Sequence, residues 1–97
     1  VQTCALPISR YVQAMYLAEK GDFDEARAKI KEGEESFVKG HEAHASLIQK
    51  EACGEKTVPT ILLMHAEDQL MNAETTKIMA EEIIKLSQRI KKLEGGE

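Results

Sequence analysis

The chain has 97 residues, of which 42% are hydrophobic, 31% charged and only 4% aromatic, and its formal net charge is −4. This length allows one small domain, and a core of aliphatic residues and Met favours helices packed on helices over a β-sandwich. The acidic net charge argues against a nucleic-acid binder. The longest apolar run (residues 61–64) is too short to span a membrane, and no secretory signal is visible. The cytoplasm is therefore the expected compartment.

The first eight residues are expected to differ in origin from the rest of the chain. Residues 1–8 resemble the translation of a common sequencing adapter, so we interpret them as a non-native scar and place the helical domain at residues 9–97. An ordinary frayed N-terminus is the alternative. We expect Pro7 to block helix continuation. Cys4 and Cys53 are isolated from each other, which argues against a disulfide framework.

Two helices are predicted in the first half of the chain. The first covers residues 9–20 and ends at Gly21, a common residue after a helix C-terminus. The second covers residues 22–52, and Asp22 with Glu25 matches the N-cap and N3 positions of a capping box. The expected inner face of this second helix comprises Ala26, Ile30, Phe37, Val38, His41, His44, Leu47 and Ile48.

A long third helix is predicted from Pro59, in its first turn, to about Leu93. Thr57 or Val58 would lie near its cap, and residues 95–96, both glycine, would close it. Roughly 35 residues make about 50 Å of helix, at about 1.5 Å per residue. A helix of this length indicates a coiled-coil-like bundle that contains more than one chain.

The third helix has a seam that is apolar in one half and polar in the other. The apolar half is spaced four, three, four and three residues apart, as in a coiled coil: Met79, Ile83, Leu86, Ile90 and Leu93. Continued backwards, the stripe meets Thr75 or Thr76, Asn72, Asp68 and His65. This polar block either projects into water or is a functional site, because histidine exchanges protons or accepts a group near neutral pH.

His41 and His44 also lie three residues apart and could together hold a metal ion. Two histidines without an obvious third ligand are weak evidence for a zinc site, so partly buried or interface histidines are the simpler interpretation.

Three segments resemble a known family: residues 21–27, residues 47–55, and residues 62–71 with the pattern His-Ala-x-Asp-x-Leu-Met from His65. The family is the IIA component of the lactose/cellobiose class of bacterial phosphoenolpyruvate-dependent sugar phosphotransferase systems. The resemblance extends from Ser9 to about Leu93.

The resemblance implies an all-α fold, an antiparallel three-helix bundle that assembles as a homotrimer around parallel C-terminal helices. His65 matches the phosphorylated histidine, which would accept a phosphoryl group from HPr and pass it to a cysteine of the IIB component. IIB would phosphorylate the sugar at the membrane component IIC. Asp68 matches a ligand of Mg²⁺ on the three-fold axis, where three converging carboxylates would otherwise repel one another.

Some positions depart from the family pattern. Gln69 stands where many members have a second histidine, Glu67 where Gln is common, and His44 where Gln is usual. We expect Gln69 and Glu67 to belong to the phosphoryl environment. The family's first helix begins well before Ser9, so this one would be shortened. A non-catalytic helical oligomerisation or interaction module is the alternative function. The sequence does not separate cellobiose, chitobiose, lichenan products and lactose as sugars.

Overall fold

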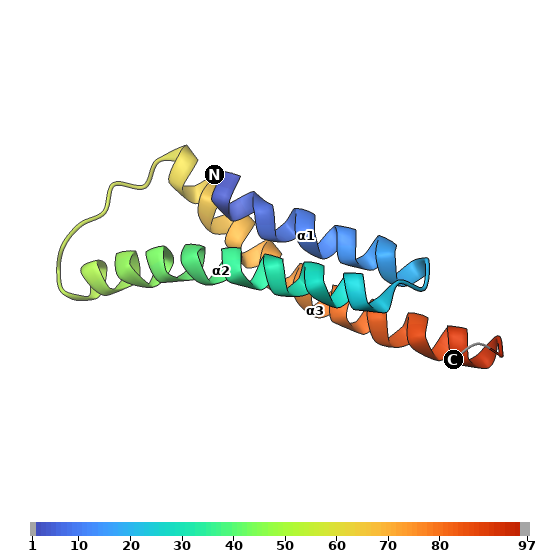
Figure 1. The fold of residues 1–97 in the computed structure, drawn as a ribbon. Helices are drawn as coiled ribbons and strands as arrows, with labels where there is room; N and C mark the ends of the chain where they lie inside the picture. The colour runs from blue at the N-terminus through green and yellow to red at the C-terminus, as the bar shows by residue number, and fades with distance from the viewer. Residues whose placement is uncertain (1, 96–97) are drawn as a thin grey trace.

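A computed structural model describes residues 2–95 of the chain, with side chains from residue 6 onward, and contains three helices over that range (Figure 1). These are α1 (Gln2–Glu19), α2 (Phe23–Ala52) and α3 (Ile61–Leu93). Consecutive helices run antiparallel, and the molecule is a rod with principal extents of 59 × 20 × 16 Å. The predicted all-α, three-helix fold is therefore confirmed.

Helix α1 starts earlier than the sequence predicted. It includes Pro7, which we expected to block it. Pro7 lies in the second turn, where the missing N–H costs one backbone hydrogen bond, and its ring is fully buried. Ile8 also packs against the core. Burial of these apolar groups offsets the lost hydrogen bond. That residues 1–8 are a non-native scar stays a prediction. The Cys4 side chain lies outside the described residues, and Cys53 is exposed.

A tight turn joins α1 to α2. Gly21 has φ of +90°, its N–H bonds to the Ala18 carbonyl, and the Asp22 N–H bonds to the Leu17 carbonyl. This is the arrangement in which a glycine with positive φ satisfies the last carbonyls of a helix. Asp22 is the N-cap of α2, as predicted, but its side chain accepts no capping hydrogen bond. The predicted capping box is therefore wrong, because the backbone turn already fixes this corner.

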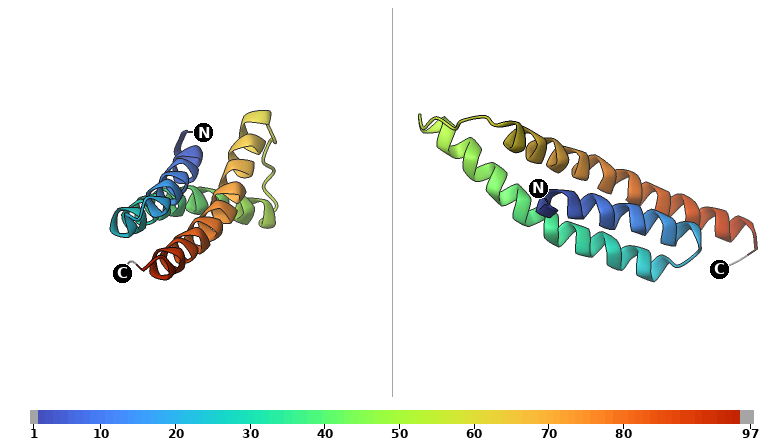
Figure 2. Two further views of the ribbon diagram at one scale, coloured as in Figure 1. Left: turned by 90° about the vertical axis from the view of Figure 1, so that its right-hand side faces the viewer. Right: turned by 90° about the horizontal axis from the view of Figure 1, so that it is seen from above.

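The core lies where all three helices run side by side (Figure 2). It is built mainly from small residues, which let the helix axes approach closely. Helix α1 lies against both other helices, and its Tyr11 ring is fully buried against Gly33 of α2. The buried apolar residues are Tyr11, Ala14 and Ala18 of α1, Ala26 and Ile30 of α2, and Leu70, Ala73, Ala80 and Ile84 of α3.

The second half of α2 has little cover. Val38 and Ile48, predicted on the inner face, are 48% and 54% exposed, and His41 is exposed as well. Only His44 and Leu47 of that half are partly buried among the predicted residues. The reason is visible in Figure 1: α2 continues well past the N-terminal end of α1, so no third helix covers this part.

Helix α3 begins at Ile61, two residues later than predicted. Thr60 is the N-cap, and its Oγ1 accepts a hydrogen bond from the Leu63 N–H at 3.0 Å. Pro59 therefore precedes the helix. At the other end Gly95 has φ of +87°, which agrees with the predicted closure, while Gly96 lies outside the described residues.

The apolar seam of α3 faces away from the core of its own chain. Met79, Leu86, Ile90 and Leu93 are each more than half exposed, and Ile83 is partly buried. The core instead uses the neighbouring stripe from Leu70 to Ile84. Of the helices described, none has a stretch both long and apolar enough to cross a bilayer.

Candidate functional site

The candidate residues occupy the first three turns of α3, next to the capped end at Thr60. None of the side chains from Ile61 to Gln69 is buried, and the first buried residue of this helix is Leu70. On a helix, residues 65 and 69 share one face, residue 68 lies near it, and residue 67 projects about 200° from residue 65, at about 100° per residue. The site residues therefore spread over two flanks of α3.

His65 is exposed on α3. Among the described residues, none makes a hydrogen bond or an ion pair with its imidazole. The side chain is thus reachable from outside the chain. A neutral imidazole in this situation is a nucleophile without a competing partner. Gln69, one turn further on, is partly buried.

Asp68 is exposed on the same outer stripe as the apolar seam. Its Oδ2 accepts a long hydrogen bond of 3.4 Å from Asn72 Nδ2, and the Asn72 carbonyl in turn accepts a bond of 2.7 Å from Thr76 Oγ1. No described cation pairs with this carboxylate. A hard cation would suit such an oxygen ligand, but a single carboxylate does not make a site on its own. Within residues 2–95, no group of three or more His, Cys, Asp or Glu side chains is placed to hold a metal.

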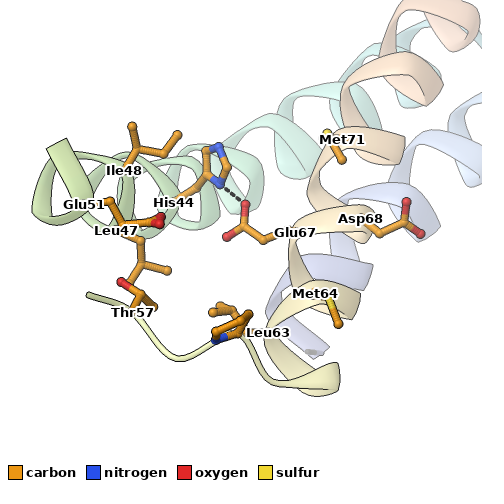
Figure 3. A pocket seen from close by; sticks show the side chains of 11 residues that line it. His44, Leu47, Ile48, Glu51, Thr57, Leu63, Met64, Glu67, Asp68 and Met71 are labelled. Carbon is orange, nitrogen blue, oxygen red and sulfur yellow. Dashed lines mark ion pairs between the residues drawn. The ribbon is translucent and has the colours of Figure 1, made fainter. Parts of the chain in front are cut away.

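Glu67 has a partner that the sequence did not reveal. Its Oε2 contacts Nδ1 of His44, which comes from α2, and Figure 3 shows Glu67 turned toward His44 while Asp68 points to the other side of α3. Both side chains are partly buried, with exposed fractions of 27% for Glu67 and 29% for His44. The two residues are far apart in sequence, so only the antiparallel packing of α2 and α3 brings them together.

The histidines of α2 form a short row of rings. Phe37 stacks on His41 with ring centroids 5.8 Å apart, and His41 lies 6.4 Å from His44 at a tilt of 34°. His44 contacts the carboxylate of Glu67 rather than sharing a ligand with His41. The weak prediction of a histidine-based metal site therefore finds no third ligand in the described part of the chain.

A cavity of about 300 Å³ lies between the ends of α2 and α3 beside this contact (Figure 3). The polar residues that line it are His44, Glu51, Thr57, Glu67 and Asp68, and His65 is not among its lining residues. Its apolar walls are formed by Leu47, Ile48, Pro59, Leu63, Met64 and Met71.

The geometry thus separates the predicted site residues into two groups. His65 and Asp68 are open to other molecules, whereas Glu67 is engaged by α2. The roles of His65, Asp68, Gln69 and Glu67 stay predictions.

Comparison with known proteins identifies relatives over most of the chain. The family model described as "PTS system, Lactose/Cellobiose specific IIA subunit" matches residues 8–88. The lichenan-specific phosphotransferase enzyme IIA component of Bacillus subtilis (strain 168) is 46% identical over 88 residues, which cover 91% of this chain and 80% of that protein. The oligo-beta-mannoside-specific EIIA component of the same organism is 39% identical over 75 residues, 77% of this chain and 68% of that protein.

A solved structure is also similar. The crystal structure of the PTS cellobiose specific enzyme IIA from Bacillus anthracis superposes with a TM-score of 0.90 at 35% sequence identity. The superposition covers 94% of this chain and 84% of that one. The similarity therefore extends over all three helices.

Proposed function

This chain belongs to the family of lactose/cellobiose-specific IIA subunits of the sugar phosphotransferase system, and on that premise we propose that it is a cytoplasmic phosphocarrier whose phosphoacceptor is His65. As a IIA component it is part of a phosphotransferase and acts in sugar phosphotransfer. The observation that supports the assignment is the exposed imidazole of His65, which no described group engages.

The proposed reaction has two steps. A neutral nitrogen of His65 attacks the phosphorus of phosphohistidine on HPr, so that a new N–P bond forms while the donor N–P bond breaks. The departing imidazole takes up a proton, and the His65 ring releases one from its other nitrogen. A cysteine thiolate of the IIB component then attacks the same phosphorus, and the His65 N–P bond breaks. IIB passes the group to a sugar at the membrane component IIC. Such transfers depend mainly on positioning and charge stabilisation, so the IIA chain needs an accessible imidazole more than an enclosed pocket.

Asp68 is the proposed ligand of a Mg²⁺ ion shared by three copies of the chain. Its exposed carboxylate is a hard oxygen donor, and it lies on the stripe of α3 that continues as Met79, Leu86 and Ile90. An exposed apolar stripe of this length marks an interaction face. With three α3 helices packed along it, three Asp68 carboxylates converge and a divalent cation neutralises their repulsion. The ion would then stabilise the trimer and would not provide the nucleophile.

Sedimentation velocity tests the assembly. We expect a trimer in Mg²⁺, a shift toward smaller species in EDTA, and loss of the Mg²⁺ dependence in Asp68→Asn. A monomer in both conditions would contradict the three-fold arrangement.

The substrate is proposed to be a β-glucoside or related disaccharide such as cellobiose, chitobiose or lactose. The relatives named above are described by their sugars as lichenan-specific, oligo-beta-mannoside-specific and cellobiose-specific. Transfer to cognate IIB components of these systems would separate them.

Phosphate uptake tests the function itself. With phosphoenolpyruvate and the general phosphotransferase proteins, we expect the chain to gain one acid-labile phosphate, visible by intact-mass spectrometry. His65→Ala should gain none, whereas His41→Ala is a matched histidine control that should be phosphorylated normally. Phosphorylation of His65→Ala would refute the site.

The alternative is a non-catalytic helical oligomerisation or interaction module. Gln69 supports it, because a neutral amide at this position cannot shuttle a proton. This alternative predicts a trimer that takes up no phosphate from HPr, so the same two experiments separate it from the phosphocarrier.

A further inference from the structure

The turns of α3 that carry His65 have little packing of their own. No side chain from Ile61 to Gln69 is buried, and the buried residues of α2 end at Gly33. Ile61, Leu62 and Met64 are exposed by 84%, 64% and 55%. Within one chain, hydrophobic burial, which orients the rest of α3, therefore does little to orient this segment.

Two polar contacts join α2 to α3 in the described part of the chain. Lys77 Nζ donates to Glu34 Oε1 at 2.8 Å within the packed half of the bundle. His44 of α2 contacts Glu67 near the start of α3 (Figure 3). The second contact is thus the polar link nearest to His65, which lies two residues from Glu67.

The environment of His44 makes this link specific. Its Nδ1 atom is shielded from solvent and has no hydrogen-bond partner apart from the carboxylate it lies against. The stacked Phe37 and His41 rings precede it along α2, and the His41 ring lies 6.4 Å from that of His44. An enclosed ring nitrogen that lost its carboxylate partner would be left unsatisfied, which is costly.

Helix geometry connects this link to His65. Because residues 65 and 67 project about 200° apart around the helix, a contact that holds Glu67 against α2 directs His65 outward on the opposite flank. The cavity of about 300 Å³ beside the contact leaves room for these turns to rotate or tilt if the contact is lost. Phosphoryl transfer is sensitive to displacements of this kind, because the nucleophile must lie in line with the leaving group.

We infer that His44 is a positioning residue for phosphoryl transfer at His65: it holds Glu67, and through it the first turns of α3, against α2. This inference rests on the proposed phosphocarrier function. It also gives Glu67 a role different from the one predicted from sequence, since the carboxylate acts through α2 rather than at the phosphoryl group.

Two measurements on His44→Ala test the inference. In hydrogen exchange of the unphosphorylated protein, we expect amides of residues 64–69 to exchange about fivefold faster, while amides of residues 80–90 are unchanged. In phosphorylation by phospho-HPr, we expect the rate at saturating donor to fall severalfold, with the half-saturating donor concentration unchanged. His44→Gln, which retains a donor for Glu67, should restore most of both properties.

Glu34→Gln is the matched control, because it weakens the other α2–α3 ion pair far from His65. It should leave exchange at residues 64–69 and the transfer rate within twofold of the parent. If His44→Ala does not fold by circular dichroism, Glu67→Ala tests the same contact from the other helix, and the same faster exchange is expected.

The outcomes separate this inference from the function it rests on. If the parent chain takes up no phosphate, the proposed function fails, while the exchange experiment still decides whether His44 holds α3. If the parent is phosphorylated and His44→Ala shows parental exchange and parental rate, the positioning role is wrong. Faster exchange with an unchanged rate also overturns it, because the contact would then be structural only.

Discussion

The packing of Tyr11 against Gly33 leads to a prediction about two glycines of α2. A Cβ atom added at Gly33 would lie 2.5 Å from Cε1 and 2.9 Å from Cδ1 of Tyr11, whose ring is fully buried. A Cβ atom added at Gly40 would meet only Cδ1 of Leu70, at 3.0 Å. The first neighbour is an enclosed rigid ring, whereas the second is the end of a flexible side chain.

The two substitutions by alanine should therefore have opposite signs. In a helix interior, Gly→Ala gains about 1 kcal/mol of stability. At Gly33 the ring must move within the core, and overpacking of this kind costs about 1–3 kcal/mol, with the short distance favouring the upper end. The net result is a loss of about 1–2 kcal/mol. At Gly40 a small rotation of Leu70 relieves the contact, so Gly40→Ala should be neutral or stabilising by up to about 1 kcal/mol.

Thermal denaturation followed by circular dichroism measures the difference, and one protein concentration is used throughout because assembly makes the melting temperature depend on concentration. For a domain of this size about 1 kcal/mol corresponds to a shift of about 4–8 °C in the melting temperature. In a Tyr11→Leu background, which removes the ring, Gly33→Ala should lose its penalty. Equal stabilities of Gly33→Ala and Gly40→Ala would refute the argument, as would a penalty that persists without the ring.

Two further predictions concern groups outside the proposed site. Burial raises the pKa of Tyr11 to about 12, so the folded state disfavours its ionised form. The free energy of unfolding should therefore fall as pH rises above about 10, where Tyr11 ionises first in the unfolded chain. Tyr11→Phe should remove this loss, whereas Tyr16→Phe, which changes an exposed ring, should not. Thr60→Ala should lower the free energy of unfolding by about 1 kcal/mol, measured by denaturant unfolding, because it removes the hydrogen bond from the Leu63 N–H. Asp22→Ala should lower it clearly less, because the Asp22 side chain makes no capping hydrogen bond. Equal losses would contradict the cap assignment.

Much of the fold was determined by local sequence. The 3.6-residue periodicity of apolar positions and the stop at Gly21 predicted three helices, and the composition, rich in aliphatic and poor in aromatic residues, predicted that helices pack on helices. These signals act over a few residues, so they are readable without the tertiary structure. The error at Pro7 had a tertiary cause: the fold buries its ring, which offsets one missing backbone hydrogen bond.

The candidate site, too, was predictable from sequence only in part. His65 and Asp68 were found from sequence, because a polar block interrupts an apolar seam on one helix and the surrounding motif resembles a known family. The exposure of the seam from Met79 to Leu93 was not predictable by periodicity alone, since a coiled-coil stripe looks the same whether it packs within its chain or against another. The position of α1 against a different stripe of α3 decided it.

Only the tertiary structure decided what Glu67 does within the chain. From sequence it is a carboxylate two residues from His65; in the bundle it contacts His44 from a different helix. Local patterns carry no information on that pair, because the register between two antiparallel helices depends on how every side chain of the core packs. Sequence thus determined the helices and singled out His65 as the candidate residue, while packing determined which flank of α3 contacts α2 and which is exposed.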